Sequence, residues 1–313
     1  MTLSLRARFL VSTSPDGLAR LDERLPTPNS LRRASEDSKA AVLAASEALS
    51  RWHPGPRDRM GVYVGQQRGS LEYCTAFIDS TWRDGPRFAS PLYFSESVAN
   101  NAATHLSLTL GFTGTIATFI GTRSAGLQAV AAAAEDIDAG VTDAGLVVAL
   151  SFPTPLTGVA YNAVYAPFRR GERVPEFRTL RGSMALLLKR EPGAGAGLAF
   201  AGSRCAGRSH GRQVKALRSL WQEYRQAHPG AVRVYPSTFC LATGPGLEAM
   251  REALGADAKF LIPPETARPE AFALDPFLLL LHSPNGAVPP ARAALCLSEE
   301  GTAGLLALEG PAA

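Results

Sequence analysis

The feature that most constrains the fold is a strand-to-helix elbow within residues 111–130, GFTGTIATFIGTRSAGLQAV. The apolar run 116–120 predicts a buried strand, because β-branched and aromatic residues favour extended backbone. A tight turn follows, and an alanine-rich helix then begins near Leu127, with Gly140 placed to end it. Such an elbow presents one side chain at a helix N-terminus, where free N–H groups and the helix dipole stabilise a thiolate or an oxyanion. In this chain the presented residue is Arg123.

The elbow resembles the nucleophile region of the β-ketoacyl synthases, a family of the thiolase-like superfamily whose pattern is roughly G-P-x-x-x-V-x-T-A-C-x-S-G-x-Q-A. Gly114, Gly126, Gln128 and Ala129 lie in the register of that pattern. The catalytic cysteine of the family then falls on Arg123, whose guanidinium is always charged and cannot act as an acyl nucleophile. The resemblance therefore implies a ketosynthase fold that lacks the ordinary condensing chemistry.

Two further catalytic positions of the family are changed. Its H-G-T-G-T motif aligns best with residues 241–245, which places Leu241 at the position of a catalytic histidine. The gating phenylalanine of its G-F-G-G-T-N-A hairpin is replaced by Glu299, although Gly301 and Thr302 are retained. His282 is a weak candidate for the second catalytic histidine, since the surrounding glycine pattern is missing. The resemblance thus supplies no catalytic residue, and the vacated positions are Arg123, Leu241 and Glu299.

The resemblance extends over most of the chain and implies an α/β fold with thiolase-like αβαβα layers, abbreviated in the second half. Alternating apolar runs and amphipathic segments agree with a layered α/β protein. The glycine-rich residues 191–197 predict an edge hairpin and a boundary between an N-terminal ketosynthase-like half, 1–192, and a shortened C-terminal half, 193–313. The expected helices start near 35, near 127 and near 247 and cover 95–110 and 208–228, and the expected strands are 5–12, 60–65, 116–120, 144–151, 184–189, 232–235, 260–263, 277–282 and 293–298.

Composition limits the classes of function. The 313 residues carry a net charge of +4 with dispersed basic side chains, which argues against nucleic acid as a partner. We expect no membrane partner and a cytoplasmic location, because apolar runs are too short to span a bilayer. The four cysteines have no paired ligand spacing, so we expect neither a zinc site nor a disulfide framework, and we expect no cofactor.

The helix expected at 95–110 lies at the subunit interface in the family that the chain resembles. Ser97, Asn101 and Thr104 give it a polar or small face, which could border a substrate tunnel or could serve only close helix packing. Residues 208–228 have a basic outer face, for which a solvated surface and the docking of an acidic acyl carrier protein are both open.

Three functional interpretations remain open. The resemblance is strongest to chain-length factors of type II polyketide systems, in particular those of polyene and aryl polyene pathways, which form a heterodimer with an active ketosynthase and shape its chain tunnel. Arg123 would then contribute to the interface together with Ser97, Asn101 and Thr104. Alternatively, Ser124 could be the nucleophile of an acyltransferase, although no histidine has a spacing that identifies it as the base. The third interpretation is a thiolase-like scaffold or binding protein.

Overall fold

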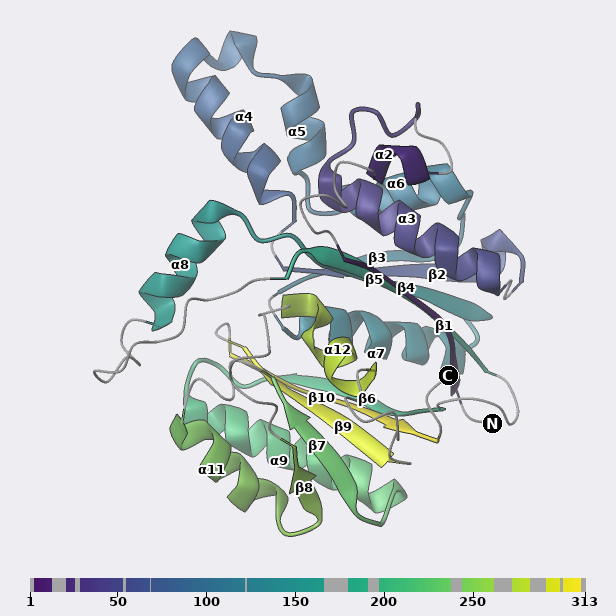
Figure 1. The fold of residues 1–313 in the computed structure, drawn as a ribbon, viewed down its shortest axis with the longest axis vertical. Helices are drawn as coiled ribbons and strands as arrows, with labels where there is room; N and C mark the ends of the chain where they lie inside the picture. Colours follow the sequence, from purple (N-terminus) through teal and green to yellow (C-terminus); the bar gives the residue numbers. More distant parts are fainter. Residues whose placement is uncertain are drawn as a thin grey trace.

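Five alternating layers of helices and strands make up the protein (Figure 1). The computed structural model describes residues 3–12, 21–25, 29–52, 55–67, 69–121, 123–165, 180–190, 197–237, 244–261, 272–281, 291–298 and 301–310. Helices cover both outer faces, and further helices lie between the two groups of strands. The predicted α/β fold with thiolase-like αβαβα layers is confirmed.

Ten strands are hydrogen-bonded in the order β3-β2-β4-β5-β1-β6-β10-β9-β7-β8. The five strands from β3 to β1 and the five from β8 to β6 repeat one pattern, with two parallel pairings followed by two antiparallel pairings. The chain therefore contains two related groups of strands. In chain order the strands are β1 (Leu3–Ser12), β2 (Met60–Gln66), β3 (Ile116–Ile120), β4 (Ala144–Ser151), β5 (Gly182–Arg190), β6 (Gly197–Cys205), β7 (Val232–Pro236), β8 (Ala258–Phe260), β9 (Ala291–Leu297) and β10 (Thr302–Glu309).

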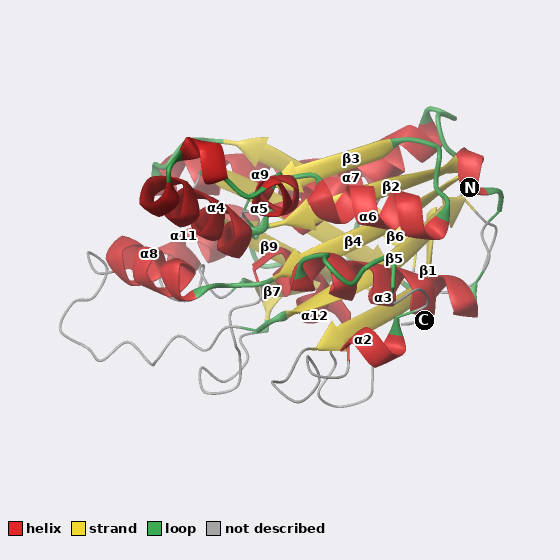
Figure 2. Cartoon of the chain, turned by 90° about the horizontal axis from the view of Figure 1, so that it is seen from above, coloured by secondary structure: helices red, strands yellow, loops and turns green. Residues whose placement is uncertain are grey.

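Most of the helices belong to one of three layers, and the others project from the body of the protein. Helices α3 (Glu36–Arg51) and α6 (Asn101–Leu110) cover the first group of strands, and α9 (His210–Ala227) and α11 (Gly244–Leu254) cover the second. Helices α7 (Ala125–Asp138) and α12 (Asp275–Leu281) lie between the groups. The remaining helical segments are α2 (Leu21–Arg24), η1 (Arg57–Arg59), α4 (Leu71–Asp84), η2 (Pro86–Phe88), α5 (Pro91–Ser97), α8 (Pro155–Tyr165) and η5 (Phe272–Leu274), several of which are visible from above in Figure 2.

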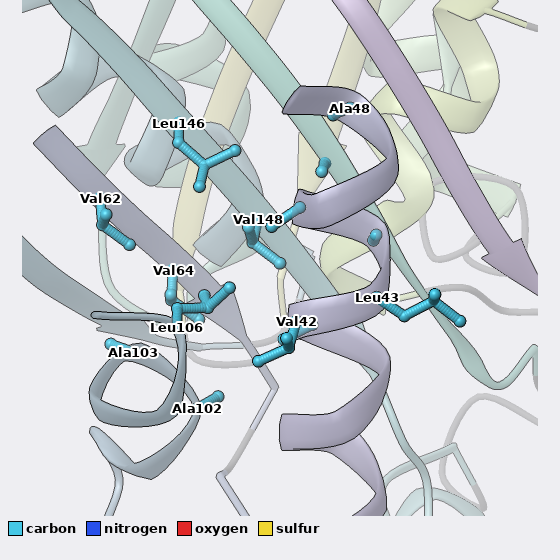
Figure 3. Close-up of a cluster of buried hydrophobic side chains, with 14 of the residues drawn as sticks. Val42, Leu43, Ala48, Val62, Val64, Ala102, Ala103, Leu106, Leu146 and Val148 are labelled. Carbon is cyan, nitrogen blue, oxygen red and sulfur yellow. The ribbon is translucent and has the colours of Figure 1, made fainter. Parts of the chain in front are cut away.

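Three buried hydrophobic clusters join these layers. The first packs α3 and α6 on the outer face of β2 and β4, where the alanines of both helices allow close approach (Figure 3). The second fills the middle layer and contains residues from both halves of the chain, such as Val147 and Leu306. The third packs α9 and α11 on the second group of strands. The middle cluster is therefore shared by both parts of the chain, and the division into halves 1–192 and 193–313 that form one packed unit remains a prediction.

Most expected elements are found, but the edge hairpin predicted around residues 191–197 is wrong. Strand β5 pairs with β1 and β4, and β6 pairs with β1 and β10, so that β1 lies between β5 and β6. The N-terminal strand thus takes the place that a hairpin partner would occupy. The pairing of β1 with β6 is short, since only Leu3 and Ser4 pair with Leu198 and Gly197 of β6.

Two other expectations are corrected. The run 277–282 was expected to be a strand, yet residues up to Leu281 belong to α12, which buries Phe277 and Leu280 three positions apart in the middle layer. The expected single helix 95–110 is two helices, because Val98 adopts an extended backbone with φ −71° and ψ 142°. This break allows Glu96 to turn inward, where its carboxylate accepts a hydrogen bond from the Ser35 N–H at 2.9 Å.

Candidate functional site

The elbow between β3 and α7 is the candidate site, and its backbone agrees with the prediction. Strand β3 ends at Ile120, the Gly121 N–H donates to the Gln66 carbonyl at 3.0 Å, and α7 begins at Ala125. Helix α7 ends before Gly140, which has a φ of +73°. Its first turn is regular, since the Gln128 N–H donates to the Ser124 carbonyl at 2.8 Å. The chain therefore builds the elbow to which the family attaches its nucleophile.

Glycines at the elbow allow neighbouring backbones to approach closely. A Cβ on Gly126 would lie 2.2 Å from the Ala273 carbonyl oxygen and 2.6 Å from the Phe277 ring. A Cβ on Gly65 of β2 would lie 2.6 Å from the Ala125 carbonyl oxygen at the start of α7. Both distances are far below van der Waals contact, so glycine is required at both positions. These contacts hold the N-terminus of α7 against β2 on one side and the second half of the chain on the other.

The two polar side chains at the turn are enclosed by the protein. Arg123 has 0% and Ser124 has 2% of its surface exposed. A buried guanidinium must be compensated by internal acceptors, since isolated charges are costly to remove from water. The guanidinium of Arg123 stays protonated and is not a nucleophile, so it cannot take up an acyl group. The isolated chain already covers the Arg123 side chain completely. Its predicted contribution to a subunit interface therefore stays a prediction.

Ser124 is not accompanied by a histidine that the structure pairs with it. His105 contacts Glu96, with 3.1 Å between Nε2 and Oε1, and His228 contacts Glu309, with 2.6 Å between Nδ1 and Oε1. His228 also stacks on the Tyr224 ring. These are the two histidines whose side chains the structure describes, and both are engaged elsewhere.

Leu241 and Glu299, the other two positions predicted to be vacated, lie outside the described residues, as does His282. Gly301, two positions after Glu299, is described by the structure. Gly301 has a φ of +97°, and a Cβ there would lie 2.4 Å from the backbone of Gly207. The β9–β10 turn therefore requires glycine for both its conformation and its space.

The three predicted tunnel residues do not share one environment. Ser97, at the end of α5, donates to the Phe94 carbonyl, and Thr104, exposed on α6, donates to the Asn100 carbonyl at 3.0 Å. Asn101 is buried, and its Nδ2 donates to Glu96 Oε2 at 2.5 Å. The structure thus separates Asn101 from the other two. The predicted contact of each residue with a growing acyl chain remains a prediction.

Asn101 belongs to a buried polar cluster that the sequence analysis did not identify. The cluster also contains Ser35, Asp37, Ser38, Ser70 and Glu96, all buried where the N-terminus of α3 meets the start of α4 and the end of α5. Ser70 Oγ donates to Asp37 Oδ2 at 2.8 Å. Burial raises the pKa of the nearby Tyr73, and Glu96 acts in the same direction. The acidic first turn of α3 was the available signal, but its partners lie far apart in the sequence.

Strand β3 forms one edge of the sheet. Within the described residues it pairs only with β2, and Ile116 and Ile120 at its two ends are each more than 40% exposed. The prediction that this strand is buried is therefore wrong for the isolated chain. An open strand edge with exposed apolar side chains is a site at which another strand can add.

Neither a metal centre nor a membrane span is present among the described residues. No group of three or more His, Cys, Asp or Glu side chains in that part of the chain could hold a metal ion. None of its helices has the length and apolar character needed to cross a membrane.

Comparisons with solved structures agree with this geometry. The fold is similar to the ishigamide ketosynthase/chain length factor, with a TM-score of 0.78, 15% identity and 99% of both chains covered. It is also similar to a ketosynthase bound to the hexaketide, solved in complex with its type II polyketide synthase acyl carrier protein, with a TM-score of 0.73, 17% identity and 99% of both chains covered. A β-ketoacyl synthase from Burkholderia phymatum gives a TM-score of 0.64 and 15% identity, again with 99% of both chains covered. At these identities the likeness concerns the fold.

No curated protein matches the chain. The family described as "Beta-ketoacyl synthase, N-terminal domain" matches residues 18–178, which is just over half of the 313 residues and includes the elbow. The layers, the elbow with its required glycines and this match agree, and the chain therefore belongs to the β-ketoacyl synthase family.

Proposed function

We propose that the chain is a non-catalytic chain-length-factor subunit that pairs with an active ketosynthase and shapes the tunnel for a polyketide or polyene chain. The observation that carries this proposal is Arg123, completely buried at the position where the family presents its nucleophile. A charged side chain enclosed there leaves neither a thiolate nor space for a thioester. The likeness of the fold to a ketosynthase/chain length factor supports the same assignment.

The pairing surface in this proposal consists of β3 and α6. Strand β3 has an open edge with Ile116 and Ile120 exposed, and Leu108 on α6 is exposed as well. A ketosynthase with the same fold carries an equivalent strand, so two such strands can complete one continuous sheet between the subunits. Burial of the apolar side chains would then add to the backbone hydrogen bonds.

The tunnel in this proposal runs along the same face. Thr104 is exposed on α6 and Ser97 lies at the end of α5, so both are available to a chain that grows between the subunits. Asn101 would act indirectly, since its side chain is held in the buried polar cluster with Glu96. The domain division at 192 and the cytoplasmic location are part of the same proposal.

An acyl carrier protein is the proposed second partner. Arg208, Arg212, Lys215 and Arg218 are exposed in and just before α9. The opposite face of α9 is buried and carries Leu217, Trp221 and other apolar residues, as the periodicity predicted. Carrier proteins of this class are acidic, so a row of basic side chains would attract them at long range.

The test is coexpression of the tagged chain with each cysteine-containing ketosynthase of the source organism. We expect one of them to co-purify in equal amounts, and the pair to condense malonyl units although the chain alone does not. Thr104→Phe should shorten the product of the pair without abolishing the first condensation, because added volume in a tunnel wall limits the space for the chain. Leu261→Phe, next to β8 at the other edge of the sheet, is the matched control.

Condensation by the purified chain alone would contradict the proposal. So would a monodisperse monomer that is indifferent to every coexpressed ketosynthase. An unchanged length distribution for an intact Thr104→Phe pair would remove α6 as the determinant of length while leaving the pairing itself in place.

A further inference from the structure

Three basic side chains lie in register across neighbouring strands of the second group. Arg292 of β9 is the register partner of Arg233 of β7, and Arg233 is the register partner of Lys259 of β8. Both pairings are parallel, and register partners on parallel strands point to the same face of the sheet, with the strands about 4.8 Å apart. The three side chains therefore form one row, which we call the basic row.

The basic row faces the middle layer. Val232 and Val234 of β7 belong to the hydrophobic cluster beneath α9 and α11, so Arg233 between them points to the opposite face. Tyr235 of β7 and Ala294 of β9 each lie two positions after a member of the row, and both pack in the middle cluster. The row is therefore on the inner face of these strands, opposite the face that α9 and α11 cover.

Basic side chains are unusual on the strands that carry them here. Strand β7 pairs on both sides, with β8 and with β9, and parallel strands in such positions are normally apolar on both faces. The row follows this rule toward the centre of the sheet, where the register partner of Arg292 is Leu308 and that of Leu308 is Leu198. A lysine on the edge strand β8 protects against aggregation, but Arg233 and Arg292 lie on inner strands, where that explanation does not apply.

The two outer members of the basic row are unpaired. Arg233 and Lys259 are exposed, and neither makes a hydrogen bond or an ion pair with another residue in the part of the chain that the structure describes. The neighbouring carboxylates are used on the outer face, since Asp257 pairs with Arg225 of α9 at 3.2 Å and Glu309 accepts a hydrogen bond from a tyrosine of α9 at 3.4 Å. Like charges directly opposite each other on adjacent strands destabilise a sheet, so the row is unfavourable unless an anion lies against it.

The basic row is separate from the elbow. Cys296 of β9 pairs with Gly304 of β10, and a Cβ on Gly304 would lie 3.0 Å from Leu127 in the first turn of α7. Arg292 precedes Cys296 by four residues, which corresponds to roughly 13 Å along the strand. At that end Arg292 is buried, with 1% of its surface exposed, and its Nη1 donates to the Gly310 carbonyl at 3.3 Å. A ligand on the row would therefore leave the elbow untouched.

We propose that Arg233 and Lys259 bind a phosphate group, either free phosphate or the phosphate of a small molecule. A phosphate carries about two negative charges at pH 7 and three acceptor oxygens, so it balances both cations at once, whereas a carboxylate balances one. The planar guanidinium of Arg233 donates two parallel hydrogen bonds to phosphate oxygens, and the ammonium of Lys259 adds a compact charge. Arg292 continues the row inward without contacting the ligand. The site goes beyond the proposed function and does not depend on it.

The test titrates the full-length chain in low-salt buffer with inorganic phosphate, with a phosphate monoester, and with chloride at matched ionic strength. Arg233→Gln and Lys259→Gln are compared with Arg87→Gln, which removes an exposed basic side chain from η2, between α4 and α5 at the far end of the molecule from β8 (Figure 1). Phosphate should raise the unfolding temperature of the unmodified chain and of the control, because a ligand of the folded state stabilises it. Each row variant should bind phosphate about tenfold more weakly or worse, the loss typical of one charge-assisted hydrogen bond.

A second readout uses the same variants without phosphate. Removal of one charge from the row should slightly raise the unfolding temperature at low salt, because the repulsion between neighbouring cations is relieved, whereas the control should not change it. If phosphate stabilises the unmodified chain no more than chloride does, or stabilises the row variants equally, the row is not a phosphate site, and the proposed pairing with a ketosynthase is unaffected. Stabilisation by the monoester alone assigns the site to phosphorylated small molecules, and stabilisation by inorganic phosphate alone assigns it to the free ion.

Discussion

The close contact at Gly126 provides a sharp prediction about the elbow. Gly126→Ala places a Cβ 2.2 Å from the Ala273 carbonyl oxygen, where ordinary contacts are well over 3 Å, so α7 and the segment before α12 must separate by about 1 Å. The nearest atom to the added Cβ belongs to the backbone, which cannot rotate away as a side chain can. This contact joins the first half of the chain to the second.

The magnitude follows from two opposing effects. Overpacking of a close-packed site costs about 1–3 kcal/mol, and the immovable carbonyl places this site at the upper end. Replacement of glycine by alanine recovers about 0.4–1 kcal/mol, because the unfolded chain becomes less flexible. The free energy of unfolding should therefore fall by about 2 kcal/mol.

Gly121→Ala is the matched control in the same elbow. A Cβ at Gly121 would meet its nearest atoms, on Ser124 and Ala125, at 3.6–3.9 Å, which is ordinary contact. Its stability should equal or slightly exceed that of the unmodified chain. Urea unfolding followed by tryptophan fluorescence measures both variants, since the buried Trp221 reports on the second half. Equal stability of the two variants would refute the argument that the elbow depends on this contact.

Three further predictions concern chemistry, burial and pH. Arg123→Cys should not create condensing activity in a malonyl-dependent assay, because the single substitution supplies no histidine partners, and turnover by this variant alone would refute that reasoning. Asn101→Ala should lower the free energy of unfolding by about 1–3 kcal/mol in urea titrations, because the buried Glu96 carboxylate loses a donor, whereas Thr104→Ala on the exposed face should change it by less than about 0.5 kcal/mol. Burial and the neighbouring Glu309 raise the pKa of Tyr224 to about 12, so neutral Tyr224 stabilises the fold below its unfolded pKa near 10 and this stabilisation is lost between about pH 10 and 12. Tyr224→Phe should show a shallower loss of stability over that range, and identical pH profiles would contradict the assignment.

The elbow was predictable because its requirements are local. A strand, a turn and a helix follow one another directly between residues 116 and 138, and Gly126 is needed because that helix packs closely against its neighbours. The same holds for the amphipathic helix α9, whose buried residues Leu217, Trp221 and Tyr224 match the helical period. Local patterns of this length determine both the element and the face that it buries.

Features that depend on distant parts of the chain were not predictable. The short apolar run 277–281 is compatible with a strand or with a helix, and only its packing in the middle layer favours the helix. The position of β1 between β5 and β6 depends on strand pairing across nearly two hundred residues. Similarly, a run of five apolar residues does not distinguish a central strand from the open edge that β3 forms.

The polar cluster shows the same limit at the level of side chains. Ser35 and Glu96 are separated by 61 positions, and their hydrogen bond exists only because the helix expected at 95–110 breaks at Val98. Neither residue type by itself indicates that the other lies within hydrogen-bond distance. That Arg123 stands at the position of the family's nucleophile remains a prediction from the register of the sequence, whereas its complete burial is found only in the structure.

Intact-mass analysis of the co-purified complex, after incubation with an acyl thioester of the carrier protein, tests the central claim most directly. The account predicts two different chains in equal amounts, this chain at its unmodified mass of 33.1 kDa and the ketosynthase carrying the acyl group. A homo-oligomer of this chain, or an acyl adduct on this chain at Ser124, would contradict it.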